Sequence, residues 1–178
     1  MRFAIASDIH GSAYWCEKLL TAFEQRRCDH LILLGDLLYH GPRNVMPRGY
    51  NPKATADLLN EYASRILAVR GNCDAEVDQA MLDFPCLAEY ALVNSEATML
   101  CTHGHKFGPG LHNSAENMPK LAPGNALLFG HTHIKAYEAN WNNTGITVFN
   151  PGSVAIPKDS GNSFGIFDNG SFSHVALS

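Results

Sequence analysis

Cysteine pairs with the spacing of a zinc site or of a small disulfide framework are missing from this chain. Its five cysteines are an odd number, lie far apart and include no Cys-x-x-Cys pair. The sequence therefore indicates neither a disulfide-stapled secreted fold nor a thiolate zinc site. Most of the cysteines are expected to be small, buried apolar side chains.

Long apolar runs and clusters of basic residues are missing as well. No stretch approaches the roughly 20 apolar residues of a membrane-spanning helix, and Asp8 and His10 interrupt the start MRFAIASDIH too soon for a signal peptide. The formal net charge is −4 and no run of like charges occurs, which disfavours binding to a nucleic-acid polymer. We therefore expect a cytoplasmic protein that contacts neither a membrane nor a nucleic-acid polymer.

Internal repeats, low-complexity tracts and linkers are also absent, and the remaining composition is that of a globular protein. Of the 178 residues, 46 % are hydrophobic and 17 % are charged, whereas disordered chains have fewer apolar side chains and more unbalanced charge. A chain of this length suits one compact domain with one core. We expect a single domain over residues 1–178.

Short apolar runs of strand length recur along the chain and end in Gly, Asp, Asn or His. Apolar residues at helical spacing predict helices at 13–25, 55–64 and about 75–82, the last with Asp74 as N-cap. Because helices and strands alternate in the first half while the second half is mostly strands, we expect a layered α/β sandwich. The expected strands are 2–7, 31–34, 66–69, 89–93, 99–101, 126–129, 146–149, 164–167 and 174–177.

The segment from residue 39 to residue 52, YHGPRNVMPRGYNP, is rich in Pro, Gly and Arg. Loops of this length without secondary structure of their own are often functional. Arg43 could bind a substrate oxygen through its planar donors, although a solvated loop arginine is an equally good interpretation. Arg48 and Tyr50 are weaker candidates for the same role.

Five segments place potential metal ligands directly beyond an apolar strand: SDIHG, LGDLL, RGNCD, THGH and FGHTH. Ligands bind outside the carboxyl ends of strands in open α/β sheets, so strands far apart in the sequence can deliver these groups to one pocket. Asp8 and His10 are two apart on a segment expected to be extended and can point the same way, as can His131 and His133. Tight turns and close backbone approach are expected at the flanking glycines 11, 35, 71, 104 and 130.

The ordered set Asp-x-His, Gly-Asp, Gly-Asn, His-Gly-His and Gly-His-Thr-His, from Asp8 to His133, resembles the calcineurin-like metallophosphoesterase superfamily. The NPGS turn at residues 150–153 extends the match. Within that superfamily, SDIHG, GDLLYHGPRN, VRGNCD and NPGSV look like segments of the bacterial YfcE-type phosphodiesterases. The resemblance implies the metallo-dependent phosphatase fold, a layered sandwich of two mixed β-sheets flanked by helices.

The resemblance also implies two divalent metal ions. The ligands that it implies are Asp8, His10 and His133 for one ion, Asn72, His103 and His131 for the other, and Asp36 as the bridge between them. Carboxylate, amide and imidazole ligands suit Mn²⁺, Fe, Co²⁺, Ni²⁺ or Zn²⁺, and Mn²⁺ is our first expectation. Because two such ions can acidify a shared water and orient a phosphate, we expect in-line attack of a metal-bridging hydroxide on a small phosphodiester.

Cys73 departs from the wider superfamily, in which the residue after the metal-binding Asn is commonly a His that helps to protonate the leaving group. A thiol with an ordinary pKa of about 8.5 could donate a proton at neutral pH, whereas two nearby cations could make it a thiolate. Cys73 is therefore either an aid to catalysis or a pocket-lining residue. His105 could contact the substrate phosphate or support a ligand, or be a turn histidine. Surface or packing roles are expected for His30, His40, His112 and His174.

Other functions remain open at this point. A phosphomonoesterase or nucleotide phosphatase would use the same metal centre, and the motifs do not separate it from a diesterase. A noncatalytic scaffold of the same fold is less favoured, because such relatives have lost metal ligands. A homo-oligomer is plausible, but nothing in the sequence specifies its interface.

Overall fold

The computed structural model describes residues 1–108 and 118–178, and its strands form two five-stranded sheets. In the first sheet the order is β10 (Ser171–Ala176), β9 (Ser163–Asp168), β1 (Phe3–Ala6), β2 (His30–Leu33) and β3 (Ile66–Ala68). In the second sheet the order is β4 (Tyr90–Asn94), β5 (Thr98–Thr102), β6 (Ala126–Leu128), β8 (Thr147–Pro151) and β7 (Lys135–Glu138).

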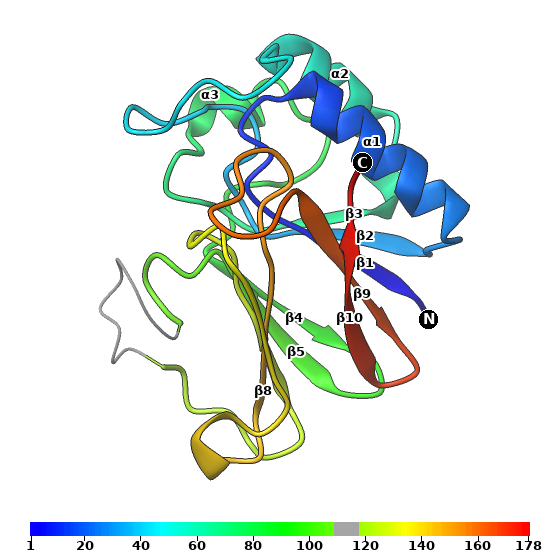
Figure 1. Cartoon of the computed structure of the whole chain (residues 1–178), viewed down its shortest axis with the longest axis vertical. Helices are drawn as coiled ribbons and strands as arrows, with labels where there is room; N and C mark the ends of the chain where they lie inside the picture. The colour runs from blue at the N-terminus through cyan, green and yellow to red at the C-terminus, as the bar shows by residue number, and fades with distance from the viewer. Residues whose placement is uncertain (109–117) are drawn as a thin grey trace.

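Both sheets are mixed, with three neighbouring parallel strands in each. Strands β1, β2 and β3 run parallel in the first sheet, and β5, β6 and β8 do so in the second. The two sheets pack face to face, and α1 (Ala13–Gln25), α2 (Pro52–Asn60) and α3 (Glu76–Gln79) cover the outer face of the first (Figure 1). The predicted α/β sandwich of two mixed sheets is confirmed.

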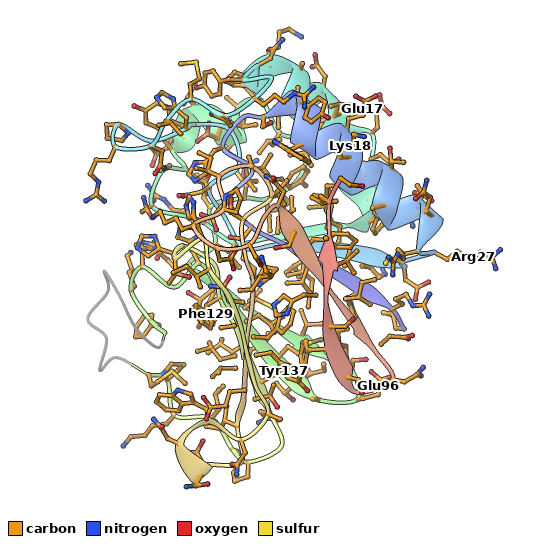
Figure 2. All side chains as sticks on the ribbon, viewed as in Figure 1. Glu17, Lys18, Arg27, Glu96, Phe129 and Tyr137 are labelled. Atoms are coloured by element: carbon orange, nitrogen blue, oxygen red, sulfur yellow. The ribbon has the colours of Figure 1, made fainter. Side chains whose placement is uncertain are left out.

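Strand β1, with the sequence FAIA, contributes side chains to two hydrophobic clusters, one on each face of the first sheet. All four residues are buried, and alternate side chains face opposite sides of the sheet. Ala4 and Ala6 pack into the cluster beneath the helices, whereas Phe3 and Ile5 pack into the cluster between the sheets. Figure 2 shows side chains filling the space between the sheets, while Arg27 and Glu96 lie at the periphery.

Helix α1 matches its predicted bounds, Ala13–Gln25. The hydroxyl oxygen of Ser12 accepts a hydrogen bond from the backbone N–H of Trp15 and caps the helix. The buried side chains Cys16, Leu19, Leu20 and Phe23 recur with helical spacing, so a single face meets the first sheet.

The other two helices differ from their predicted bounds. Helix α2 begins earlier than residue 55 because the Asn51 side chain accepts the Ala54 N–H and Pro52 occupies the first turn. It ends at Asn60, whose side chain bonds to Met81 and Asp83 instead of facing solvent. Helix α3 is shorter than predicted, with only four residues.

Strand β7 was not predicted, whereas every predicted strand is present with shifted ends. Its sequence, KAYE, is short and polar and lies at an edge of the second sheet, with Tyr137 exposed. Edge strands with one polar face carry little apolar periodicity. Within residues 1–108 and 118–178, no helix has the length and apolarity to cross a bilayer.

Candidate metal centre

The candidate ligands lie in the loops that follow five of the parallel strands. Asp8 and His10 follow β1, Asp36 follows β2, and Asn72 follows β3. From the second sheet, His103 follows β5, and His131 and His133 follow β6. These loops gather on one side of the sandwich, as the sequence predicted from the carboxyl ends of parallel strands (Figure 1).

Three of these side chains form one close group. The Nε2 atom of His133 lies 3.2 Å from Oδ1 of Asp8, and the Nε2 atom of His10 lies 3.6 Å from the same oxygen. The two Nε2 atoms are 3.3 Å apart. One carboxylate oxygen and two imidazole nitrogens therefore point at one small volume.

Asp36 joins this group to a second one. Its Oδ2 atom lies 3.7 Å from Nε2 of His10 and 3.5 Å from Nε2 of His103. On the far side, Nε2 of His103 is 3.1 Å from Oδ1 of Asn72. The carboxylate of Asp36 thus stands between an imidazole of each group.

The orientation of three histidine rings is fixed from behind by the backbone. The Nδ1 atoms of His10, His103 and His133 lie 2.8, 2.6 and 2.6 Å from the carbonyl oxygens of Tyr39, Leu34 and Ile156 respectively. Because a carbonyl oxygen only accepts, each Nδ1 donates a proton, so each of these imidazoles, when neutral, presents the lone pair of its Nε2 atom to the centre. This is the arrangement of metal-binding histidines.

The backbone of the centre is strained. The residues Asp8, His10, Asp36, His131 and His133 have φ values of 59°, 49°, 56°, 66° and 60°. Left-handed backbone at a non-glycine residue costs about 1 to 3 kcal/mol, and it recurs here at five of the seven candidate ligands. The prediction that the Asp8–His10 and His131–His133 pairs lie on extended segments was wrong, because each pair curls in a tight turn.

Hydrogen bonds between the loops hold this strained backbone in place. The N–H of Asp8 donates to the carbonyl oxygen of Gly35 at 3.1 Å, and that of His10 donates to the carbonyl oxygen of Asp36 at 2.9 Å.

The close approach of these loops to one another also requires glycine, as predicted. A Cβ atom on Gly71 would lie 2.1 Å from Oδ1 of Asp36, and one on Gly130 would lie 1.9 Å from Oγ of Ser7.

The prediction that Asp74 caps helix α3 was wrong. The N-cap is Ala75, whose N–H donates to the carboxylate of Asp78. The carboxylate of Asp74 instead accepts the backbone N–H groups of Asp36, Leu37 and Gly71 at 2.8, 2.8 and 2.6 Å. The side chain of Asp74 therefore points towards the site and not towards the helix. It connects the loop of Asp36 to the loop of Asn72.

The charges of the centre favour a bound cation. Burial raises the pKa of Asp8 and Asp36, but the neighbouring imidazoles outweigh it and keep both carboxyls ionised. Burial lowers the pKa of His103, but the carboxylate of Asp36 outweighs it and raises this pKa to about 9. Burial and then His103 lower the pKa of His131 to about 4. Two ionised carboxylates, those of Asp8 and Asp36, thus lie in a small volume with imidazoles that cannot all be protonated, and this negative charge favours a bound cation.

A divalent cation fits this donor set. The Oδ1 atom of Asp8 is buried and accepts no hydrogen bond of good geometry from the part of the chain that the structure describes. It faces the Nε2 atoms of His10 and His133, and neither of these atoms bonds to a carbonyl oxygen within residues 1–108 and 118–178. The groups Asp8–His10–His133 and Asp8–Asp36–His103 each bring their ligand atoms within 4.8 Å of one another. Imidazole and carboxylate ligands suit Mn²⁺, Zn²⁺ and related ions.

A cavity of about 280 Å³ opens beside the centre. Arg43 and Cys73 line this cavity, but His105 does not. The ring of His105 lies 5.4 Å from that of His103 and 6.1 Å from that of His131. The full lining comprises Asp36, Gly41, Pro42, Arg43, Asn44, Asn72, Cys73, His131, His133 and Lys158.

The weaker candidates of the 39–52 loop lie away from this cavity. The guanidinium of Arg48 stacks over the ring of Tyr14 at 3.7 Å, and Tyr50 packs against His40. Among the histidines outside the motifs, His30 stacks on Phe3 and His174 stacks on Phe149, so both are packing residues. His112 lies outside the described residues.

Cys73 lies at the junction of the two groups. Its N–H donates to Oδ1 of Asp36 at 2.8 Å, and its Sγ atom accepts a hydrogen bond from Nδ2 of Asn72 at 3.2 Å. Burial and then the charge of Asp36 raise the pKa of the thiol, which favours its protonated form. The group His10–Asp36–Cys73 also brings its ligand atoms within 4.8 Å.

Sequence reasoning missed two kinds of supporting residue. Lys158 lines the cavity but follows no recognised motif. Asn150 and Ser153, in the NPGS turn, bond to Gly130 and to the carbonyl oxygen of Asp8. The turn was noticed, and its position after a strand could have placed it beside the ligand loops.

Comparison with known proteins identifies the family. A model of the calcineurin-like phosphoesterase superfamily domain matches residues 1–171. The chain belongs to this superfamily. It is 47 % identical over 180 residues to Phosphodiesterase YfcE of Escherichia coli strain K12, a match that covers 99 % of this chain and 92 % of that protein. The predicted family and the predicted class of phosphoric ester hydrolase are confirmed.

Solved structures agree with this placement. A structure of Yfce, described as a phosphoesterase from E. coli, superposes with a TM-score of 0.88 at 42 % identity and covers 100 % of both chains. An archaeal phosphodiesterase superposes with a TM-score of 0.67 at 18 % identity and covers 99 % of this chain and 100 % of its own. At that identity the second likeness concerns the fold alone.

Proposed function

We propose that this protein is a phosphodiesterase that hydrolyses a small phosphodiester with the help of two divalent metal ions. The observation that carries the proposal is the position of Asp36, whose Oδ2 atom lies between the Nε2 atoms of His10 and His103 at 3.7 and 3.5 Å. A carboxylate in this position can bridge two cations. The 47 % identity to Phosphodiesterase YfcE supports a diester as the substrate.

The proposed ligands fall into two sets. Asp8, His10 and His133 would hold one ion, Asn72, His103 and His131 would hold the other, and Asp36 would bridge both. The tight group around Oδ1 of Asp8 supports the first set. The contact between His103 and Asn72 supports the second. Mn²⁺ is the proposed ion because oxygen donors accompany the imidazoles, although Zn²⁺, Fe, Co²⁺ and Ni²⁺ suit the same donors.

Bound divalent ions would activate a water molecule as the nucleophile and would stabilise the negative charge that develops around the phosphorus. The chain's own residues position the reactants. Arg43 lines the cavity and can donate two parallel hydrogen bonds to two oxygens of a phosphate. The protonated thiol of Cys73 can donate to the leaving oxygen, and His105 supports the second metal set from outside the cavity.

A phosphomonoesterase or nucleotide phosphatase remains the second candidate, because the same dinuclear centre serves monoesters. A noncatalytic scaffold is disfavoured, since all seven proposed ligands are present and the imidazoles of His10, His103 and His133 converge with Asp8 and Asp36. The cytoplasmic location, the absence of a nucleic-acid partner and any homo-oligomer stay predictions from the sequence.

The experiment compares bis(p-nitrophenyl) phosphate with p-nitrophenyl phosphate as substrates of metal-stripped protein, with and without Mn²⁺. We expect turnover only with metal and a higher kcat/KM for the diester. A preference for the monoester would promote the phosphatase alternative. The same assay is repeated with Zn²⁺, Fe, Co²⁺ and Ni²⁺. If neither ester is hydrolysed with any of the five metals, an enzymatic role is contradicted.

A further inference from the structure

Lys158 approaches the metal centre from a segment that no motif marks. It lines the same cavity as Asp36 and His133. Its backbone N–H donates to the carbonyl oxygen of His133 at 2.9 Å, and Nδ1 of His133 in turn donates to the carbonyl oxygen of Ile156 at 2.6 Å. Two hydrogen bonds therefore fix the backbone of Lys158 relative to a proposed metal ligand, and its side chain extends along the cavity wall.

The ammonium group of Lys158 has no carboxylate partner in residues 1–108 and 118–178, although an acid is its direct neighbour in the chain. The carboxylate of Asp159 is held by Lys135, whose N–H and Nζ atoms each lie 2.7 Å from one of its oxygens. Arg43 lines the same cavity and likewise has no ion-pair partner among the described residues. Two uncompensated cations thus face one cavity.

The positive charge of Arg43 and Lys158 is more than is needed to bind a phosphodiester that carries a single negative charge. Two divalent ions would bring four positive charges, whereas the ligands Asp8 and Asp36 bring two negative ones, so the loaded centre already attracts a singly charged diester. Arg43 and Lys158 add positive charge to the wall of the cavity, outside the proposed ligand set. An anionic group on the substrate, remote from the reacting phosphate, would neutralise them.

We infer that Lys158 is a specificity-determining residue that selects phosphodiesters carrying a second anionic group, a phosphate or a carboxylate, on the arm that is not released. The inference rests on the proposed function, since it assigns the substrate class of that site. Lys158 binds the remote anion at the rim of the cavity, and the proposed metal centre binds the reacting phosphate. Arg43 lies in the same wall and is free to serve either group.

The test uses two chromogenic esters that differ only in the remote group. One is thymidine 5′-(p-nitrophenyl phosphate), and the other carries an additional 3′-phosphate. The readout is the ratio of their kcat/KM values with Mn²⁺-loaded protein. We expect the wild type to favour the 3′-phosphorylated ester, and Lys158→Gln to lower the ratio by up to about fivefold, as the loss of one ion pair at an exposed site would. Lys158→Glu should lower it further.

Lys53→Gln is the matched control, because Lys53 pairs with Asp57 on the exposed face of α2 and lies away from the cavity. It should leave the ratio unchanged. A second readout does not depend on turnover: calorimetry compares the binding of thymidine 5′-phosphate and thymidine 3′,5′-bisphosphate. The bisphosphate should lose its advantage in Lys158→Gln.

The outcomes separate this inference from the proposed function. If the wild type hydrolyses both esters and Lys158→Gln keeps the wild-type ratio in both readouts, the role of Lys158 is overturned and the diesterase stands. If neither ester is hydrolysed but the bisphosphate advantage in binding still depends on Lys158, the anion site stands and the diesterase fails.

Discussion

Two regions of the site differ in how the protein holds them. The ligand cluster, defined as Asp8, His10, Asp36, His103 and His133, is at most 3 % exposed. Its side chains are fixed by backbone carbonyls and by left-handed turns. The pocket rim, defined as Arg43, Cys73 and Lys158, is exposed or half-buried. Several independent contacts hold each side chain of the ligand cluster, whereas residues of the pocket rim can be replaced without disturbing the cluster. Substitutions in the cluster should therefore change the rate of the reaction, and substitutions in the rim should change the choice of substrate.

The largest effect is expected in the cluster, from Asp36→Asn. The substitution removes the proposed bridging charge, and we expect turnover to fall by about 10³-fold or more, since metal-ion stabilisation of the transition state amounts to several kcal/mol. The fold should survive, because the amide oxygen can still accept the N–H of Cys73 that Oδ1 accepts at 2.8 Å. Steady-state kinetics and the urea midpoint provide the two measurements. Activity near that of the wild type would refute the two-metal centre.

Asp74→Ala tests whether the backbone frame of the cluster matters as much as its ligands. Three buried N–H groups lose their acceptor, and each such loss costs about 1 to 3 kcal/mol. We expect the free energy of unfolding to drop by about 3 kcal/mol or more, together with weaker metal binding. Asp78→Ala is the control, since the carboxylate of Asp78 accepts only the N–H of Ala75 among the described residues, and this variant should leave activity intact. Equal effects of the two variants would contradict a special role for Asp74.

Cys73→His changes the rim without changing the proposed ligands. An imidazole in the cavity wall would be a better proton donor than the thiol, whose pKa is raised by burial and by Asp36. We expect a gain of up to about tenfold on esters with alkyl leaving groups and little change on p-nitrophenyl esters, because only poor leaving groups need an acid. Cys73→Ala removes the thiol without adding an acid. A profile of leaving groups identical in all three proteins would show that this position does not assist the reaction.

The smallest effect is a proton release on metal binding. Because Asp36 raises the pKa of His103 to about 9, its imidazole carries a proton at pH 7, and that proton must leave before Nε2 can bind a cation. Calorimetry of Mn²⁺ binding in buffers of different ionisation enthalpy should find about one proton released from this group at pH 7. The contribution falls as the pH rises towards the pKa. Release that only increases with pH would point to ionisation of water alone.

The sequence predicted the parts of the fold that depend on local patterns. The strands that carry the ligands are continuous apolar runs, and α1 has both a cap and a periodic apolar face. The polar edge strand β7 has neither signal and was missed. The predicted α3 was too long, because Asp74 looked like an N-cap and the acidic residues after it looked like the first turn of a longer helix.

The candidate site was predictable in its ligands but not in its support. The motifs named the residues that converge, since side-chain chemistry beyond a strand is visible in the sequence. The left-handed backbone at Asp8 and His10 is not visible there, because it depends on bonds to the loop of Asp36. The role of Asp74 likewise depends on tertiary partners far away in the chain. Lys158 belongs to no motif, and only the folded cavity brings it to the site.

The most direct test of the two-metal centre is a titration of metal-stripped protein with Mn²⁺, followed by the rate of bis(p-nitrophenyl) phosphate hydrolysis. We expect no turnover without metal, and a rate that saturates at two ions per chain. Full activity of the stripped protein, or saturation at one ion per chain, would contradict the two-metal centre.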